Sequence, residues 1–299
     1  MLTIFTIPKP FRGHAGVIQN NAIQSWLLLR PQPEVILFGN DEGTAGAATA
    51  LGARHIPDIE CNEYGTPLVN SVFGIAQDKA NNQIVCYVNA DIILLGDFLP
   101  AIRQVQKQSF LIVGRRWDID IKEPLDFNKP DWESNLRVRV TGEGKLHPPS
   151  GIDYFTFPRG LYRDIPPFAV GRTAWDNWLI YRARVMKLPV IDATRVITAI
   201  HQNHDYSHNA AGTAGVWKGP ESNRNKELLG GLDRAFTLDH ATMLLTHRGI
   251  RRALQPRNLY FRLEALPVLC PRLHCFSKPM RALTRLLSRI RSGSGVTKS

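Results

Sequence analysis

Continuous apolar runs alternate with apolar stripes along the first ninety residues. Runs typical of buried strands occur at 2–7, 34–39, 55–56 and 84–88. Between them, apolar side chains recur every three to four positions, the spacing of helices, at 16–30, 44–51 and 69–76. This order of strand, helix and strand predicts an α/β fold built on a doubly wound, parallel sheet.

The second half of the chain has a less regular pattern. Strands are predicted at 110–113, 153–157, 190–191 and 196–200, and a helix at 173–187. A polar segment rich in Pro and Gly, 118–149, is interpreted as a long loop with a hairpin, and 201–226 as mostly loop. Residues 238–245 are expected to open a final helical region.

Ligands of such sheets bind at the carboxyl ends of the strands. The segments predicted to lie there are 8–14, 39–44 and 89–91. In the last of these, Asn89 and Asp91 follow an apolar strand with one residue between them, so an extended chain points both side chains to the same side. Their oxygens suit a hard divalent cation. The pattern is also typical of an Asp that caps a helix or forms a turn.

The positive charge of the chain is concentrated near its C-terminus. The net charge is +11, and residues 247–299 hold twelve Lys and Arg against one acid. Apolar residues at helical spacing in 279–291 make this segment amphipathic as well as basic. We therefore expect two parts, a domain over 1–245 and a basic amphipathic helical tail over 246–299. The tail is expected to contact an anionic membrane surface; packing on the body and, less favoured, nucleic-acid binding are the alternatives.

Several protein classes do not fit the sequence. No segment reaches the roughly 18 to 20 apolar residues of a membrane span, and the N-terminus lacks the pattern of a signal peptide. The four scattered cysteines indicate reduced thiols instead of a disulfide framework. We expect a cytoplasmic protein, peripheral on the inner face of a membrane. Glycine-rich dinucleotide, P-loop and α/β-hydrolase motifs are absent, which counts against those enzyme classes.

The order of these features resembles that of GT-A glycosyltransferases, over roughly residues 1–245. Asn89-Ala90-Asp91 resembles the D-x-D motif of that family, with Asn in place of the first Asp, and 70–76 resembles the helix before it. Residues 38–44 and 7–11 resemble the turns that contact the nucleoside. The segments 151–159, 168–172 and 175–179 resemble the acceptor-side block. The resemblance implies a Rossmann-like GT-A fold with a mixed central sheet.

The resemblance also implies an activity and a cofactor. A sugar would move from a nucleotide-diphosphate sugar to a hydroxyl of a glycan or lipid-linked acceptor, as in polysaccharide biosynthesis. A divalent metal, Mn2+ or Mg2+, would be held by Asp91 with His201 or His204. For the two histidines, a polar loop with ordinary hydrogen bonds is the alternative.

The remaining candidate residues have roles in binding the donor or in catalysis. The donor would be held by Thr6, Pro8, Phe11, Asp41 and Asn89. Arg116 is a further candidate for donor binding, because a guanidinium suits phosphate or sugar hydroxyls. Arg116 is equally suited to pair with local acids.

Two carboxylates are candidates for catalysis. Asp176 would be the base of an inverting reaction, whereas Asp153 would act if the reaction retains the anomeric configuration. Helix capping or pairing with Arg172 is the alternative for Asp176.

Two other functions stay open at this point. The Asn in the D-x-D place also fits a catalytically silent GT-A-like scaffold or glycan-binding protein. The basic tail fits a nucleic-acid binder, which is the least favoured of the three.

Overall fold

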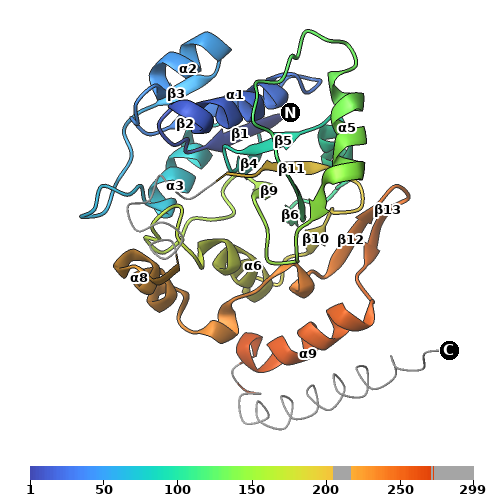
Figure 1. Cartoon of the computed structure of the whole chain (residues 1–299). Helices are drawn as coiled ribbons and strands as arrows, with labels where there is room; N and C mark the ends of the chain where they lie inside the picture. Colours follow the sequence, from blue (N-terminus) through green and yellow to red (C-terminus); the bar gives the residue numbers. More distant parts are fainter. Residues whose placement is uncertain (205–216, 271, 273–299) are drawn as a thin grey trace, which may run out of the picture.

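A nine-stranded mixed sheet runs through the centre of the molecule (Figure 1). The structure is a computed structural model that describes residues 1–204, 217–270 and 272. The strands of this sheet are, in spatial order, β13 (Gly249–Arg252), β12 (Met243–Thr246), β10 (Val190–Asp192), β6 (Leu111–Val113), β9 (Tyr154–Pro158), β4 (Ile84–Val88), β1 (Leu2–Thr6), β2 (Glu34–Phe38) and β3 (Arg54–Ile56). Strand β9 is antiparallel to its neighbours β4 and β6, and β13 is antiparallel to β12. All other neighbouring strands are parallel.

A second, four-stranded sheet lies beside the first. Its strands are, in order, β5 (Ile92–Leu94), β11 (Ala199–Gln202), β7 (Arg116–Ile119) and β8 (Lys145–Leu146). Helix α5 (Trp132–Glu143) covers it, with Leu136 and Val140 packed against Ile119 and Ile200. This sheet matters for the site because β11 and β7 bring distant polar residues beside the end of β4.

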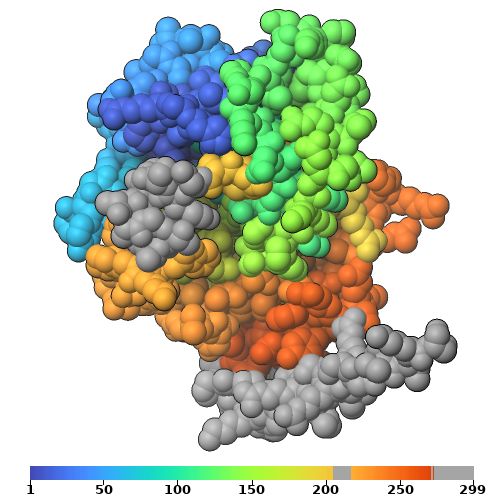
Figure 2. Space-filling view, in the orientation of Figure 1, coloured from blue at the N-terminus to red at the C-terminus, as the bar shows by residue number. Residues whose placement is uncertain are grey.

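Helices cover both faces of the large sheet. One face packs against α1 (Gly13–Leu27), α2 (Thr44–Leu51) and α4 (Phe98–Arg103). The other packs against α3 (Val69–Lys79), α6 (Trp175–Val185), α8 (Pro220–Leu229), η2 (Leu238–His240) and α9 (Pro256–Leu269). The short η1 (Leu232–Arg234) contacts α6, α8 and α9. In the space-filling view, the blue N-terminal residues lie toward the top of the molecule and the red-orange residues of α9 toward the bottom (Figure 2).

The predicted α/β class and the mixed central sheet are confirmed. Residues 44–51 and 84–88 form α2 and β4 with the predicted bounds, and β1, β2, β3 and α3 form where the pattern places them. The reason is visible in the burial: strands covered by helices on both faces, such as β1, bury every residue and so appear in the sequence as continuous apolar runs. Helix α1 begins and ends about three residues before the prediction.

Three predictions about secondary structure are wrong. Where the structure describes 201–226, this segment is not mostly loop: 201–202 end β11, and 220–226 belong to α8. The segment 118–149 contains α5 and β8 as well as loops. The sequence pattern did not predict α5 because only Leu136 and Val140 of this helix are buried, too few to form an apolar stripe at helical spacing. Residues 238–245 do not open a helical region: after η2 the chain enters β12, which pairs with β10. A short apolar run does not distinguish a buried strand from a helix.

The structure describes only part of the expected tail. The predicted boundary at 245/246 falls within β12, and β13 and α9 continue from there. The basic amphipathic helix predicted at 279–291 lies outside the described residues, so its contact with a membrane stays a prediction. Within 1–204, 217–270 and 272, no helix combines the length and the apolar character needed to cross a membrane.

Candidate active site

A cleft of about 470 Å³ opens at the carboxyl ends of the parallel strands β1, β2 and β4. Nine of the predicted site residues line it: Pro8, Asp41, Asn89, Asp91, Arg116, Asp153, Asp176, His201 and His204. They come from seven separate segments of the chain. The structure therefore gathers most of the candidate residues around one cavity.

Two predicted residues lie outside the lining. Thr6 is the last residue of β1 and is fully buried in the sheet. Phe11 packs its side chain against Gly43, and its backbone N–H donates to the carbonyl of Glu42 at 2.8 Å. Phe11 thus fastens the loop after β1 to the loop after β2, while Pro8 and Asp41 from the same loops reach the cleft.

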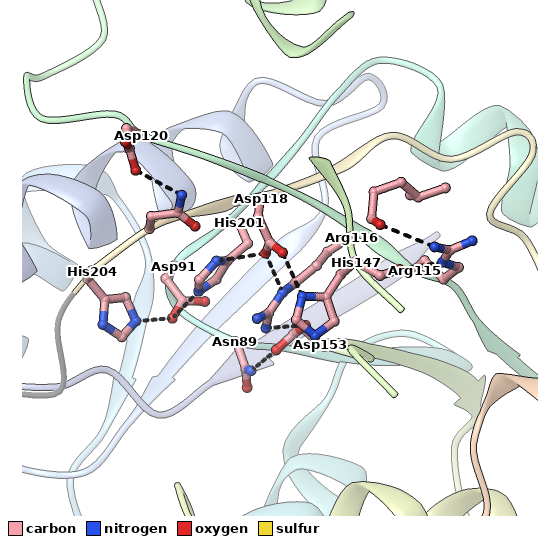
Figure 3. A network of polar contacts seen from close by, with 12 residues as sticks. Asn89, Asp91, Arg115, Arg116, Asp118, Asp120, His147, Asp153, His201 and His204 are labelled. Atoms are coloured by element: carbon pink, nitrogen blue, oxygen red, sulfur yellow. Dashed lines mark hydrogen bonds and ion pairs between the residues drawn. The ribbon is translucent and has the colours of Figure 1, made fainter. Parts of the chain in front are cut away.

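Asp91, His201 and His204 bring three potential metal-ligand atoms together (Figure 3). Their ligand atoms all lie within 4.8 Å of one another. Nε2 of His204 is 3.0 Å and Nε2 of His201 is 3.8 Å from Oδ2 of Asp91. The register explains the meeting: His201 on β11 pairs with Ile92 on β5, the residue after Asp91.

The carboxylate of Asp91 is suited to a cation. Its Oδ1 is buried and has no hydrogen-bond partner among the residues described. An unpartnered buried carboxylate oxygen is costly unless a positive charge faces it. Burial alone would raise the pKa of Asp91, but His201, His204 and Lys9 outweigh it and hold that pKa well below its usual range. The oxygen and nitrogen donors of this cluster fit a divalent ion such as Mn2+.

Asp118 contacts His201 and links it to His147 and Arg116. Asp118 on β7 lies opposite His201 on β11 in the strand register, and its Oδ1 lies 3.2 Å from Nδ1 of His201. Its Oδ2 lies 2.6 Å from Nδ1 of His147, and its Oδ1 accepts a hydrogen bond from Nε of Arg116 at 2.9 Å. Although burial opposes it, the contact with Asp118 raises the pKa of His201, and Asp91 adds to the rise. A carboxylate on Nδ1 leaves Nε2 as the nitrogen that faces Asp91.

The sequence analysis missed Asp118 and His147 as site residues. Both belong to the region interpreted as a loop. Arg116 and Asp118 alternate along β7, so their side chains share one side of the strand, and this was the only signal available.

Arg116 and Asp153 continue the polar network from Asp118 to Asn89 (Figure 3), and both line the cleft. Nη1 of Arg116 donates to Oδ2 of Asp153 at 2.8 Å, and Nδ2 of Asn89 donates to Oδ1 of Asp153 at 2.6 Å. Both oxygens of Asp153 are therefore engaged by neighbouring side chains.

Asp176 lies in the first turn of α6 and faces the same cleft. Burial raises its pKa to about 6, and the charge of Asp153 adds to the rise, while backbone N–H groups at the helix start oppose it. The preceding Ala174 has φ 90°, a left-handed conformation that is unfavourable for a residue with a side chain. This sharp turn directs the start of α6, and Asp176 with it, into the cavity. Arg172 does not pair with Asp176 but with Glu221 of α8.

The aromatic residues near the cleft differ in exposure. Trp175 and Trp178 are buried, and Trp175 packs its ring against Tyr87 and Phe155. Trp217 also lines the cleft but is 53% exposed. Of these three, Trp217 is the one with a face available to a ligand.

Comparisons with known proteins give matches among solved structures only. No family model and no curated protein matches the chain. Glucosyl-3-phosphoglycerate synthase from Mycobacterium tuberculosis, solved with Mg2+ and uridine diphosphate, is similar with a TM-score of 0.46 and 15% identity, covering 79% of each chain.

A mannosyltransferase from Pyrobaculum calidifontis, solved with GDP-Man and Mn2+, has a TM-score of 0.43 and 14% identity, covering 97% of this chain and 79% of that one. Because these TM-scores lie below 0.5, the likeness to these two proteins carries no argument about function. The function is inferred from the geometry of the site.

Proposed function

We propose that this protein is a glycosyltransferase that moves a sugar from a nucleotide-diphosphate sugar to an acceptor hydroxyl, with a divalent metal. One observation carries the proposal: the cluster of Asp91, His201 and His204 shares a cleft with Asp176, a carboxylate whose pKa is raised to about 6. A cation site beside a carboxylate with the pKa of a general base is the arrangement that this transfer requires.

The metal would be held by Asp91 with His201 and His204 as nitrogen ligands. Bound there, Mn2+ or Mg2+ would neutralise the charge that develops on the leaving diphosphate. Arg116 lines the same part of the cleft and offers N–H groups to the diphosphate oxygens. Pro8, Lys9 and Asp41 would hold the nucleoside at the ends of β1 and β2.

Asp176 would act as the base of an inverting reaction. Its carboxylate takes the proton of the acceptor hydroxyl while that oxygen bonds to C1 of the sugar. The bond between C1 and the diphosphate oxygen breaks, and its electron pair leaves with the diphosphate. Asp153 is less suited to attack C1, because Asn89 and Arg116 engage both of its oxygens.

The acceptor would enter beside Asp176, where Trp217 and Arg172 line the cleft. The charge of Arg172 is already matched by Glu221, whose side chain is 10% exposed and also accepts from Asn62. An exposed tryptophan face and a neutralised arginine favour an uncharged, hydroxyl-rich acceptor such as a glycan or the sugar of a lipid-linked glycan.

Donor turnover tests the proposal without knowledge of the acceptor, since water replaces it slowly in hydrolysis. The protein is incubated with Mn2+ and each of a panel of nucleotide-diphosphate sugars, and the released nucleoside diphosphate is measured. We expect release from one donor or a small set, lost when EDTA removes the metal. Absence of release from every donor by folded protein, with simple sugars also supplied as acceptors, would count against the proposal.

Substitution of Asp118 is expected to weaken metal binding without removing a ligand. Three side chains, Arg116, His147 and His201, converge on its two oxygens, and Asp118→Asn leaves only one oxygen for them. We expect Mn2+ affinity to fall about tenfold or more, in the range usual for residues that orient metal-bound histidines. Titration followed by the electron paramagnetic resonance of free Mn2+ measures it. Asp126→Asn, at an exposed loop position, is the control, and equal affinity in both variants would contradict the orienting role.

A further inference from the structure

Asn89 is fixed to Asp153 at two points. Its backbone N–H donates to the carbonyl of Asp153 at 2.9 Å, and its side-chain Nδ2 donates to Oδ1 of the same residue at 2.6 Å. The two residues meet because Val88 pairs with Tyr154 where β4 runs antiparallel to β9. The side-chain amide therefore faces a carboxylate and acts there as a donor.

The second oxygen of that carboxylate holds Arg116. Asp153 is 6% exposed, and its Oδ2 accepts from Nη1 of Arg116 at 2.8 Å. Nε of Arg116 is held in turn by Asp118 at 2.9 Å. Two carboxylates thus fix the plane of the guanidinium, whereas its Nη2 makes no hydrogen bond to a described residue. A guanidinium has five N–H groups, so several are left for a ligand in the cleft.

A carboxylate at position 89 would not fit this arrangement. It has no N–H to donate, and its oxygen would lie where Nδ2 now approaches Oδ1 of Asp153. Two carboxylates at hydrogen-bonding distance cannot both be ionised without a large penalty. Either one takes up a proton, or the pair moves apart and Asp153 releases Arg116.

We infer that Asn89 is a positioning residue and not a ligand of the cation: it holds Asp153, and through it Arg116, so that the guanidinium faces the diphosphate of the donor. This inference rests on the proposed function, because it assigns Arg116 a diphosphate as ligand. It explains why Asn replaces the first Asp of the D-x-D pattern: the carboxylate of this pair is on Asp153 instead of on residue 89.

An exchange of the two residues offers a sharp test. In Asn89→Asp/Asp153→Asn, the amide at 153 supplies a carbonyl oxygen to Arg116 and an N–H to the carboxylate at 89. Both hydrogen bonds are kept, and the net charge is unchanged. Neither single change achieves this, because Asn89→Asp lacks a donor and Asp153→Asn has one oxygen for two donors.

The affinities of UDP and GDP at fixed Mn2+ are measured by calorimetry for the wild type, both single variants and the exchanged double variant. Asn223→Asp, exposed on α8, controls for an added negative charge. We expect Asn89→Asp to bind the better nucleotide about tenfold more weakly or worse, and the double variant to recover to within about threefold of the wild type. If Asn89→Asp does not fold, the same recovery is read against Asp153→Asn.

The possible outcomes distinguish a failure of the role inferred for Asn89 from a failure of the proposed function. Tighter or unchanged binding by Asn89→Asp, or a double variant no better than the single ones, would overturn the inference and leave the proposed function standing. A wild type that binds neither nucleotide, with or without Mn2+, would overturn both.

Discussion

Asp91→Asn is expected to abolish metal-dependent donor binding and to lower kcat/KM at least about a thousandfold. The variant keeps the shape of the side chain but removes the only carboxylate of the proposed metal cluster within the described residues. His201 and His204 then face an amide. Loss of a cation that neutralises a leaving diphosphate removes several kcal/mol of transition-state stabilisation, and about 4 kcal/mol corresponds to a thousandfold in rate.

Two readouts distinguish this result from a loss of folding. Mn2+ titration should show the cluster site missing in Asp91→Asn, while the circular dichroism spectrum of the wild type and a cooperative melting transition are kept. The melting temperature itself should fall, because the folded state stabilises the ionised carboxylate. Asp58→Asn, at an exposed position outside the cleft, should keep both metal binding and turnover. Normal Mn2+-dependent turnover by Asp91→Asn would contradict the assignment of this residue.

Asp176→Asn is expected to keep donor binding and to lose kcat by about a hundredfold to ten-thousandfold, the usual contribution of a general base. Donor affinity should persist, because Asp176 lies in the first turn of α6, on a different segment from the metal cluster. Comparison of kcat with the donor dissociation constant separates the two effects. A parallel loss of donor affinity and an unchanged kcat would contradict the assigned role.

The raised pKa of Asp176 gives this prediction a pH signature. A base acts only when it is ionised, so wild-type kcat/KM should fall as the pH decreases through about 6. At saturating Mn2+, Asp176→Asn should lose the part of this acidic limb that comes from residue 176, whereas the part that comes from protonation of His201 should remain.

The raised pKa of Asp176 also affects the stability of the folded protein. Because the pKa of Asp176 is higher in the folded protein, about 6 against an ordinary 3.8, folding opposes its ionisation. Its contribution favours the folded state most below pH 3.8 and is lost as the pH rises through 6. Asp176→Asn, which never ionises, is therefore expected to be more stable than the wild type at pH 7, by on the order of 2 kcal/mol.

The parts of the fold that could be predicted are those with strong local patterns. β1, β2 and β4 are buried between two helical layers, so their apolar runs are continuous and their carboxyl ends locate the cleft. Helix α5 and strand β12 could not be predicted, because two buried residues in one and a short apolar run in the other leave no readable period.

The site shows the same division. Asp91 and Asp176 line the cleft as the sequence suggested, because each follows or begins a recognisable element. Asp118 was missed because its role depends on the register of β7 with β11, which brings it opposite His201. The pairing of Asn89 with Asp153 likewise depends on an antiparallel strand that enters from 64 positions away in the sequence.

The central claim is that a nucleotide-sugar donor and a divalent metal bind together in this cleft. A thermal-shift panel of nucleotide-diphosphate sugars, each with Mn2+ and with EDTA, tests it most directly, because a ligand of the folded state raises its melting temperature by mass action. At a hundredfold excess over the dissociation constant, the account predicts a rise of about 5 °C or more for one donor, only with Mn2+. No rise with any donor, or the same rise in EDTA, would contradict it.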